Sequence, residues 1–390
     1  MDDVTLLATA DWDHPIWTNK QHVACALADL GHRVLYVDSI GLRPPRRGGA
    51  DRGRLLRRLR QGLRPPRRVR GNVWVWSPLV LPGARTAWQV RLNRWILNLG
   101  LRLCRLWLRL RPDWLWTYNP LTLQLVDPGP YRRLIYHCVD AIQAQPDMPA
   151  ATIDAWEERL CRRADIVFVT SPQLLERHRP HNPRTVFHPN VADADHFAAA
   201  MTEPLCVPRE IERLPRPRLG FIGAISAYKL DLPMLESLAR RHPAWTFVLI
   251  GPVGEGDPTT EVRDLAALDN VHLLGPRSYA DLPACLKGLD VALLPLRLND
   301  YTRAMFPMKF FEYLASGRPV VATAIDALQA FRDVAVITAP HEEAFAEGIA
   351  RVLRGEGPTL ERRLGGARAH TYRGRTESML EAIHTLPSPP

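Results

Sequence analysis

The chain has 390 residues, 46% of them hydrophobic and 24% charged, a composition typical of a soluble globular protein with room for two domains. The net charge is +10, but residues 1–111 carry 21 Lys and Arg against 7 Asp, whereas the remainder carries 30 basic against 34 acidic residues. Six scattered cysteines without C-x-x-C spacing, no run of 18 apolar residues and an acidic N-terminus argue against a disulfide framework, a membrane span and a secretory signal. We therefore expect a cytoplasmic protein.

The first half of the chain alternates apolar runs with helical stretches, which predicts a parallel sheet with crossover helices. Helices are expected at 19–30 and 152–163, among others. The expected strands are residues 4–9, 33–38, 72–76, 113–118, 133–139, 165–170 and a short run that ends near Pro189.

A basic block interrupts this alternation between Arg43 and Arg70, with 12 Arg and a single Asp. Such a block suits a polyanionic surface, either anionic lipid or nucleic acid. The alternative is a solvated loop that is rich in Arg because of genomic composition. Aromatic residues that would stack on bases are not interleaved in it, which disfavours nucleic acid.

A long helix is predicted at 84–110 from apolar residues at helical spacing, with arginines on a narrow opposite stripe. Two interpretations stay open: a helix packed on its sheet with arginines outside, or one with a surplus apolar face that contacts a membrane interface. The stripe comprises Trp88, Leu92, Trp95, Leu99, Leu103, Leu106 and Leu110, and Ile96, Leu97, Leu101, Cys104 and Leu108 widen it.

A Pro-rich bridge at 205–218 separates this half from a second alternation of strands and helices. Two such series predict two doubly wound α/β domains, assigned here to residues 1–200 and 201–371. The strands expected in the second are 218–223, 245–251, 270–275, 290–296, 319–323 and 334–338.

Ligands of doubly wound sheets bind beyond the carboxyl ends of the strands, so the loops after strands supply the candidate site residues. In the second domain these candidates are Gly223, Lys229, Gly251, Pro252, Arg277, Tyr279, Asn299 and Thr302. The last of these loops leads into F-P-M-K-F-F-E-Y-L-A-S-G-R-P-V-V, residues 306–321.

This stretch predicts a helix that begins near Pro307 and ends at a Gly-Arg-Pro stop, followed by a buried strand. Lys309 and Glu312 lie one turn apart on it. They form either a simple surface ion pair or a ligand site, in which Lys309 and the helix start bind a phosphate and Glu312 accepts hydroxyl hydrogen bonds.

Residues 306–323 resemble the donor-binding signature P-x-K-x-x-E-Y-x-A-x-G-x-P-V-V of the retaining family-four glycosyltransferases. The opening stretch 11–39 is similar to the branch that makes teichuronic acid and other cell-surface polysaccharides. The resemblance implies the GT-B fold, two Rossmann-like domains facing a central cleft, with a C-terminal helix (about 377–386, within 372–390) that packs back on the first domain.

The resemblance also implies roles for individual residues. Glu312 would bind the donor ribose, Lys229 and Lys309 the diphosphate, and residues 271–279 would frame the nucleobase. The sugar would be transferred with retention, without a metal and without a cofactor other than the nucleotide-sugar substrate. The sequence departs from the pattern at Ala304, where many members carry a second Glu, and at 13–19, where a Gly-Gly loop is usual. The segment 188–197 similarly lacks the family's Gly.

Candidate catalytic residues of the first domain are His137 and Asp140, expected at a strand end that faces the cleft. The alternative is that both are satisfied by local hydrogen bonds. His14 and Asn19 are candidates for acceptor or cleft contacts, and D-W-D at 11–13 is interpreted as a loop rather than a metal site.

The leading hypothesis is therefore a glycosyltransferase that extends a polysaccharide or a lipid-linked saccharide, on the inner face of the plasma membrane. The basic block 43–70 and helix 84–110 would contact the anionic membrane surface. The alternatives are a GT-B sugar-nucleotide epimerase or hydrolase and a non-enzymatic polyanion-binding protein. The sugar, the nucleobase and the acceptor are not specified by the sequence.

Overall fold

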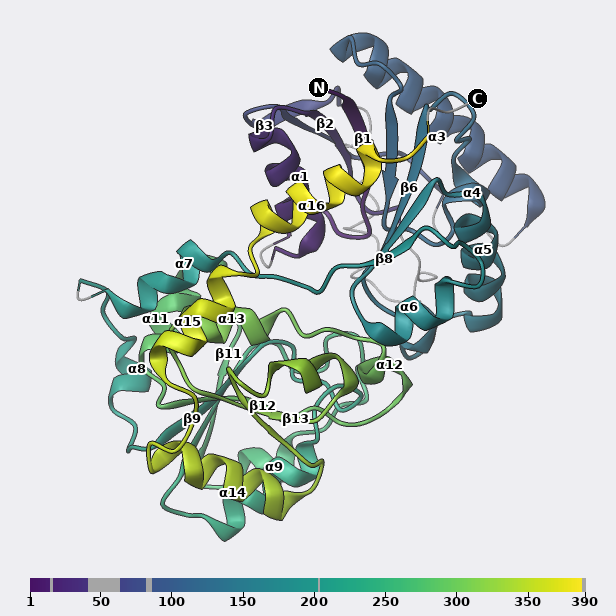
Figure 1. Ribbon diagram of the computed structural model, residues 1–390. Helices are drawn as coiled ribbons and strands as arrows, with labels where there is room; N and C mark the ends of the chain where they lie inside the picture. Colours follow the sequence, from purple (N-terminus) through teal and green to yellow (C-terminus); the bar gives the residue numbers. More distant parts are fainter. Residues whose placement is uncertain (15–16, 41–63, 82–85, 203, 388–390) are drawn as a thin grey trace.

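The computed structural model describes residues 1–14, 17–40, 64–81, 86–202 and 204–387. It contains two α/β units, each built on its own sheet, one above the other in Figure 1. Most of the basic block 43–70 lies outside the described residues. None of the helices within the described ranges is long and apolar enough to cross a membrane.

The first sheet has eight strands in the order β3-β4-β2-β1-β5-β6-β7-β8. Every pair is parallel except β3 with β4, which is antiparallel. The central strands are buried throughout because helices cover both faces, as in other doubly wound sheets. The strands are β1 (Asp3–Leu7), β2 (Arg33–Val37), β3 (Arg67–Arg70), β4 (Val73–Trp76), β5 (Trp114–Thr117), β6 (Arg133–Cys138), β7 (Ile166–Val169) and β8 (Thr185–Phe187).

The second sheet has six parallel strands in the order β11-β10-β9-β12-β13-β14. The order reverses at β9, so the two halves of the sheet diverge there and leave their carboxyl ends open to a ligand. The strands are β9 (Arg218–Ile222), β10 (Thr246–Ile250), β11 (Val271–Gly275), β12 (Val291–Leu294), β13 (Val320–Thr323) and β14 (Val336–Thr338).

Helices cover both faces of each sheet. Before β9 the helices are α1 (Asn19–Asp29), α3 (Ala87–Leu108), α4 (Thr122–Leu125), α5 (Ala150–Arg163) and α6 (Pro172–His178), followed by α7 (Ala194–Ala198) and α8 (Arg209–Glu212), which pack into the core of the second unit. Those of the second half are α9 (Leu232–Arg241), α10 (Arg263–Ala266), α11 (Leu282–Lys287), α12 (Asp300–Arg303), α13 (Lys309–Ala315), α14 (Glu342–Leu353), α15 (Leu360–Arg368) and α16 (Tyr372–His384).

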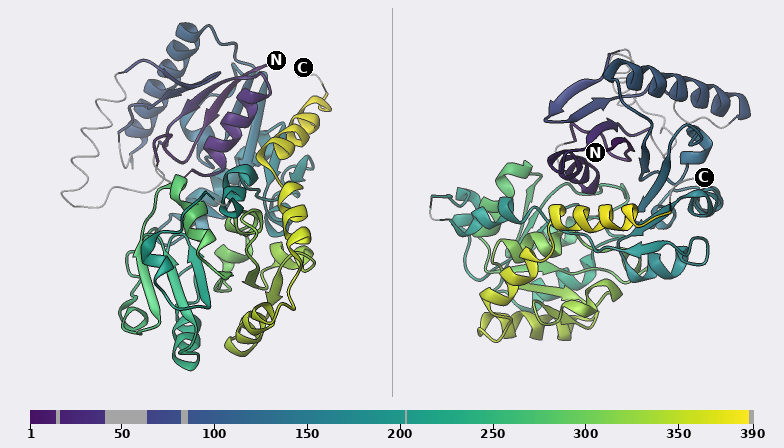
Figure 2. Two further views of the ribbon diagram at one scale, coloured as in Figure 1. Left: turned by 90° about the vertical axis from the view of Figure 1, so that its left-hand side faces the viewer. Right: turned by 45° about the horizontal axis from the view of Figure 1, so that its top comes forward.

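The C-terminal helix α16 leaves the second unit and returns to the first, where it lies beside α1 (Figures 1 and 2). Met379, Leu380 and Ile383 pack into the same core as Val23 and Leu27 of α1, on one face of the first sheet. The domain boundaries 1–200 and 201–371 stay predictions.

On the other face of the first sheet, α3 and α5 pack into a separate core. Leu97, Leu101 and Cys104 of α3 are the residues that enter it. Gly100 lets α3 approach the sheet, since a Cβ at that position would collide with the Trp76 ring. The residues that contact the sheet are therefore those that widen the predicted apolar stripe, and Trp88, Trp95 and Leu106 of the stripe itself are exposed.

A strand within the basic block was not predicted. Arg67–Arg70 forms β3, which adds to the edge of the sheet in antiparallel pairing with β4. Arg67 pairs with Asp13 and Arg70 with Asp29, both on exposed surface. The four-residue sequence R-R-V-R carries no apolar run because an edge strand with one solvated face does not require one.

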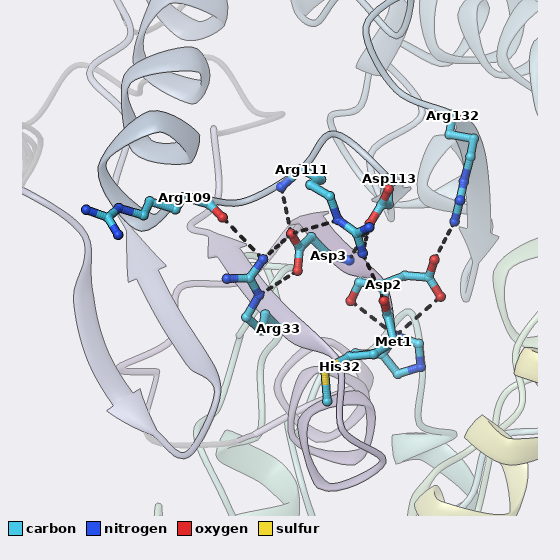
Figure 3. Close-up of polar contacts among 9 residues, drawn as sticks. All are labelled: Met1, Asp2, Asp3, His32, Arg33, Arg109, Arg111, Asp113 and Arg132. Carbon is cyan, nitrogen blue, oxygen red and sulfur yellow. Dashed lines mark hydrogen bonds and ion pairs between the residues drawn. The ribbon is translucent and has the colours of Figure 1, made fainter.

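The amino ends of the first sheet are joined by an ionic network, drawn in Figure 3. Asp3 accepts from the Arg33 side chain (2.7 Å) and from the Arg111 backbone (2.6 Å), and Arg33 also donates to the Arg109 carbonyl (3.2 Å). Arg109 ends α3 in the left-handed conformation, at a φ of 52°. The network therefore fixes the C-terminal end of α3 against β1 and β2.

Candidate active site

The carboxyl ends of the two sheets meet at a contact made by the loop before α13. The side chain of Asn190, which follows β8, donates to the Phe306 carbonyl (2.6 Å), and the Ser171 hydroxyl donates to the Ala304 carbonyl (2.9 Å). Ala304 is buried and belongs to the same core as residues of α5 and β7 of the first unit. A Glu at position 304 would have to bury its carboxylate in this core. The site where the sequence departs from the family pattern is therefore one where a small apolar residue packs.

Lys309, the first residue of α13, lies against the loop after β9. A Cβ at Gly223 would collide with Cε of Lys309 and lie 3.0 Å from its Nζ, so the ammonium group sits over the Gly223 backbone. Gly223 and Gly251 have φ values of 153° and 147°, which residues with a side chain rarely adopt. The N–H groups of the two glycines already donate to the Ile250 and Gly275 carbonyls (2.7 and 2.9 Å), so the phosphate-binding group at this position is the Lys309 ammonium.

Glu312 lies one turn further along α13, and no salt bridge joins it to Lys309 in the described structure. Burial raises the pKa of the Glu312 carboxyl, while Lys309 and His196 oppose the shift. Tyr279 and Tyr372 are near enough for its charge to contribute to their raised pKa values, to which burial contributes most. Lys309 and Glu312 therefore do not form the simple ion pair that the sequence allowed, and the charge of Lys309 acts on the carboxyl without a direct contact.

The rings of Tyr279 and Tyr372 belong to two stacked pairs at the contact between the units. Tyr279 stacks on His196 with ring centroids 4.3 Å apart, and His22 of α1 stacks on Tyr372 of α16 at 4.2 Å. His196 Nε2 also contacts the Tyr279 carbonyl (2.9 Å). Burial lowers the pKa of His22 to about 3, so its ring is neutral. One face of the Tyr279 ring is thus covered by His196, and its role in donor binding stays a prediction.

A second group of charges lies on the first unit's side of the contact. Asp140 follows β6 by two residues, and the Tyr301 side chain of α12 is its hydrogen-bond partner. Burial raises the pKa of Asp140, and Lys20 and Lys229 oppose this shift. Lys20 lies over the Tyr118 ring, 5.6 Å from its centroid, and burial lowers its own pKa. Charged groups from both units therefore meet around Asp140.

Sequence reasoning missed Lys20 and Tyr301. The signal for Lys20 was compositional, because the chain has only four Lys among its 51 basic residues. Three of the four (Lys20, Lys229 and Lys309) lie where the carboxyl edges meet, and the fourth, Lys287, donates to the Thr202 carbonyl (2.6 Å). Lysine in this Arg-rich chain thus marks positions where a compact ammonium group is needed.

His137 lies within β6 rather than at its end, and it is completely buried. Its ring lies 4.8 Å from that of Tyr118, and neither of its nitrogens has a hydrogen-bond partner among the described residues. Burial lowers its pKa well below the usual range, helped by the charge of Arg375. His137 is the penultimate residue of β6, which ends at Cys138, and its assignment as a catalytic residue stays a prediction.

Three other candidates use their polar atoms within the protein. Asn299 caps α12 by accepting from the Thr302 N–H (3.0 Å) and donates to the Tyr228 carbonyl (2.6 Å), while the Thr302 hydroxyl donates to the Arg297 carbonyl. Asn19 donates to Asn190 (2.9 Å) and accepts from Arg375 of α16 (2.8 Å). These side chains hold the site loops and α16 in place.

The remaining predicted site residues are engaged by neighbouring residues in the surrounding loops. Arg277 pairs with Glu210 at 2.9 Å rather than with the Lys309–Glu312 group. Pro252 accepts from the Ile225 N–H (2.9 Å), and Pro307 precedes α13, where its carbonyl accepts from Phe310 (3.0 Å). His14 is in the loop after β1, and its N–H donates to the Asp11 carbonyl (3.2 Å).

Within the described ranges, one group of side chains is close enough to hold a metal ion: Cys138, Glu157 and His178. This group is buried beside α5 and α6, on the face of the first sheet opposite to α1 and α16. Glu157 already accepts from the Tyr136 hydroxyl (2.5 Å) and from Arg177 (3.3 Å). These bonds engage the Glu157 carboxylate, whereas His178 Nε2 has no hydrogen-bond partner among the described residues.

Comparisons with known proteins agree with this geometry. Residues 216–355 match the family model described as "Glycosyl transferases group 1". TuaH of Bacillus subtilis, named as a teichuronic acid biosynthesis glycosyltransferase, is 40% identical over 106 residues. That alignment covers 27% of this chain and 26% of the relative, so the chain matches about a quarter of the relative's length.

Solved structures match over nearly the full chain, among them the following two. Sucrose-phosphate synthase from Thermosynechococcus elongatus superposes with a TM-score of 0.72 at 16% identity, over 99% of both chains. HepE of Anabaena, in complex with UDP-glucose, has a TM-score of 0.67 at 16% identity and covers 98% of this chain and 100% of its own. The fold is therefore GT-B, with two Rossmann-like α/β units, as the sequence predicted.

Proposed function

We propose that the chain is a glycosyltransferase that moves a sugar from a nucleotide-sugar donor to a saccharide acceptor. The observation that carries the proposal is the placement of Lys309 against Gly223, with the Glu312 carboxylate one turn away and not paired with it. A nucleotide-sugar presents both a diphosphate and a ribose diol, and this pair of side chains offers one group for each.

On the donor side, Lys309 and Lys229 would hold the diphosphate over the backbone of Gly223 and Gly251. Fixed positive charges stabilise the negative charge that develops on a departing diphosphate. Glu312 would accept hydrogen bonds from the two ribose hydroxyls, and charge-assisted bonds of this kind are stronger than neutral ones. Because HepE was solved with UDP-glucose, a uridine nucleotide is the first candidate donor.

On the sugar side, we place Asp140 and Lys20 near the transferred sugar, and His137 behind them as a packing residue. Transfer would form the bond between the acceptor oxygen and the anomeric carbon and break the bond from that carbon to the phosphate. The acceptor proton would pass to a donor phosphate oxygen, on the face that the phosphate leaves, and the configuration would be retained. The lysines would supply the positive charge at the leaving group, so the reaction would need no metal ion.

The acceptor that we propose is a growing polysaccharide or a lipid-linked saccharide, presented at the cytoplasmic face of the membrane. The proposal draws on the name of the Bacillus subtilis relative and on the positive charge of residues 1–111. The acceptor would enter between the carboxyl edges of the two sheets, on the side of Asp140.

A donor panel tests the activity. The melting temperature of the protein is measured with UDP-, GDP-, dTDP- and CDP-sugars. The sugars of one nucleotide should raise it, because a ligand that binds only the folded state stabilises that state. The stabilising donor is then incubated with saccharide acceptors. A new glycosidic product supports transfer, an altered free sugar-nucleotide would indicate an epimerase, and released sugar alone a hydrolase. No stabilisation by any donor would contradict the proposal.

A further inference from the structure

Helix α3 has two apolar faces, and only one of them is covered. The buried face consists of Asn93, Leu97, Leu101 and Cys104, which point to the sheet. At 3.6 residues per turn, the large apolar residues left exposed fall on the opposite side, within an arc of about 120°. They are Trp88 (60% exposed), Trp95 (63%), Leu99 (41%), Leu103 (57%), Leu106 (65%) and Trp107 (71%).

This outer face concentrates the exposed apolar surface of the protein. Six of the thirteen large hydrophobic residues that are exposed in the described part of the chain lie on this one helix. Contiguous patches of this kind mark sites of interaction, whereas single exposed residues do not. The helix lies on the outer side of the first unit (Figures 1 and 2), so a flat partner can reach its whole length.

The charged residues of α3 itself are all basic, and exposed Asp127 is an acidic residue close to the helix, because its N–H donates to Asn98 Oδ1 (2.9 Å). From Arg52 to Pro112 the sequence contains no acidic residue, and on α3 itself Arg91 and Arg102 are exposed along one edge of the apolar face. Arg109 follows at the end of the helix, and Figure 3 shows its side chain pointing away from the acidic network. None of the three forms a salt bridge with a described carboxylate. The partner must therefore supply negative charge around an apolar contact.

The outer face is held in place at both ends. Thr86 and Gln89 form a capping box at the start of α3, and the Asn93 side chain bonds both the N–H (2.7 Å) and the carbonyl (3.0 Å) of Leu81. At the other end, the Arg109 carbonyl is bound by Arg33, within the Asp3 network. The exposed rings are therefore presented by a fixed helix whose other face is committed to the core.

We propose that the outer face of α3 docks on an anionic lipid bilayer, with Trp88, Trp95 and Trp107 in the interface and Arg91, Arg102 and Arg109 at the lipid phosphates. Tryptophan favours the interface, where an apolar ring and a polar N–H are both satisfied, and basic side chains add attraction to anionic headgroups. A second copy of the chain fits less well, since it would bring the same arginines into the contact. The inference does not rest on the proposed catalytic activity.

Vesicle flotation tests this docking. The full chain is mixed with vesicles of phosphatidylcholine containing one third phosphatidylglycerol, or of phosphatidylcholine alone, and a triple Trp88→Ser, Trp95→Ser, Trp107→Ser variant is compared with the wild type. We expect wild-type binding to the anionic vesicles that weakens from about 50 to about 500 mM salt. The triple variant should bind about tenfold or more weakly, because it loses the apolar contact.

Two controls separate the contributions. Leu353→Ser with Leu360→Ser removes exposed apolar residues from the second unit and should leave binding unchanged. Arg91→Gln with Arg102→Gln should weaken binding to anionic vesicles several-fold, whereas Arg213→Gln with Arg263→Gln should not. Binding by the triple variant equal to that of the wild type would overturn the proposal, as would a wild-type dimer in light scattering that the triple variant abolishes.

Discussion

Lysine is scarce in this chain, and its distribution shows which charges the site needs. Arginine supplies all but four of the 51 basic positions, yet Lys20, Lys229 and Lys309 lie where the two carboxyl edges meet. The side chain of Lys309 passes so close to Gly223 that no Cβ fits between them. A guanidinium is broader and planar, so an arginine in its place would meet the Gly223 backbone. Size, as well as charge, therefore accounts for lysine at position 309.

Gly223→Ala tests this contact. The new Cβ would displace the Lys309 ammonium, and alanine would also be strained at a φ of 153°. We expect the strain to cost about 1–3 kcal/mol of the free energy of unfolding. Nucleotide-sugar binding, measured by calorimetry, should weaken by about tenfold or more, because a phosphate contact is lost.

The matched control is Gly355→Ala, at a φ of 80° with open space around the added Cβ. This variant should lose stability through backbone strain and keep its affinity for the donor. Equal affinities for wild type, Gly223→Ala and Gly355→Ala would contradict the placement of the donor diphosphate beside Gly223.

Glu312 makes stability depend on pH in a direction that can be checked. Its pKa is raised in the folded protein, so the folded state holds the proton more tightly than the unfolded state. Stability from this group is therefore present at low pH and is lost as pH rises above its ordinary value of 4.5. Glu312→Gln should match the wild-type free energy of unfolding near pH 4 and exceed it increasingly toward about pH 8.

Denaturant titrations at several pH values measure this gap. The exposed Glu261→Gln serves as the control and should show no such divergence. A gap for Glu312→Gln that is constant, or that narrows as pH rises, would show that the carboxylate is not held in a desolvated position.

At the scale of elements, α16 is the clearest case of a helix whose position is determined by contacts with residues that are distant in sequence. Met379 is fully buried among residues of β1, α1 and β5, although it lies more than 200 residues after them in sequence. Met379→Ala should lower the free energy of unfolding by about 2–5 kcal/mol, because it leaves a cavity in the first core.

Met201→Ala provides the comparison, since Met201 is 37% exposed and should cost far less. Unfolding followed by tryptophan fluorescence reports mainly on the first unit, which holds most of the tryptophans. Equal losses for the two variants would mean that α16 does not contribute to that core.

The elements that sequence analysis predicted well are those with a simple apolar pattern. Most strand positions agree with the structure within two residues, because a strand buried on both faces reads as a short apolar run. β3 escaped prediction because R-R-V-R has no such run. In α3 the pattern showed a broad apolar surface, and could not show which side meets the sheet, since that depends on Trp76 and Gly100.

The residues of the candidate site likewise fall into those that a local sequence pattern predicts and those that only contacts between the units reveal. Gly223, Lys309, Glu312 and Tyr279 were predicted because strand-end loops and a recognisable motif carry them, and the structure brings them together. Lys20 and Tyr301 join the site only through contacts between the two units, which local pattern does not contain. Asn19 and Thr302 were predicted as ligand contacts, but their polar atoms turn out to be used by neighbouring backbone and side chains.

At the scale of the whole molecule, the two units are joined through the site itself. A chain of hydrogen bonds runs from Arg375 of α16 through Asn19 and Asn190 to the Phe306 carbonyl, three residues before Lys309. The donor residues therefore sit at the contact on which the relative position of the units depends. If α3 docks on a bilayer, this contact is held at a fixed height above the lipid surface.

The most direct test of the central claim is a calorimetric titration of the stabilising nucleotide-sugar into the wild type, Glu312→Ala and Lys287→Ala. Loss of the ribose hydrogen bonds should weaken donor binding to Glu312→Ala by about 10- to 100-fold, the equivalent of about 1.5–3 kcal/mol. Its circular dichroism should be unchanged. Lys287→Ala, whose lysine lies away from the site, should bind like the wild type. Wild-type affinity in Glu312→Ala would contradict the assignment of this site to a nucleotide-sugar.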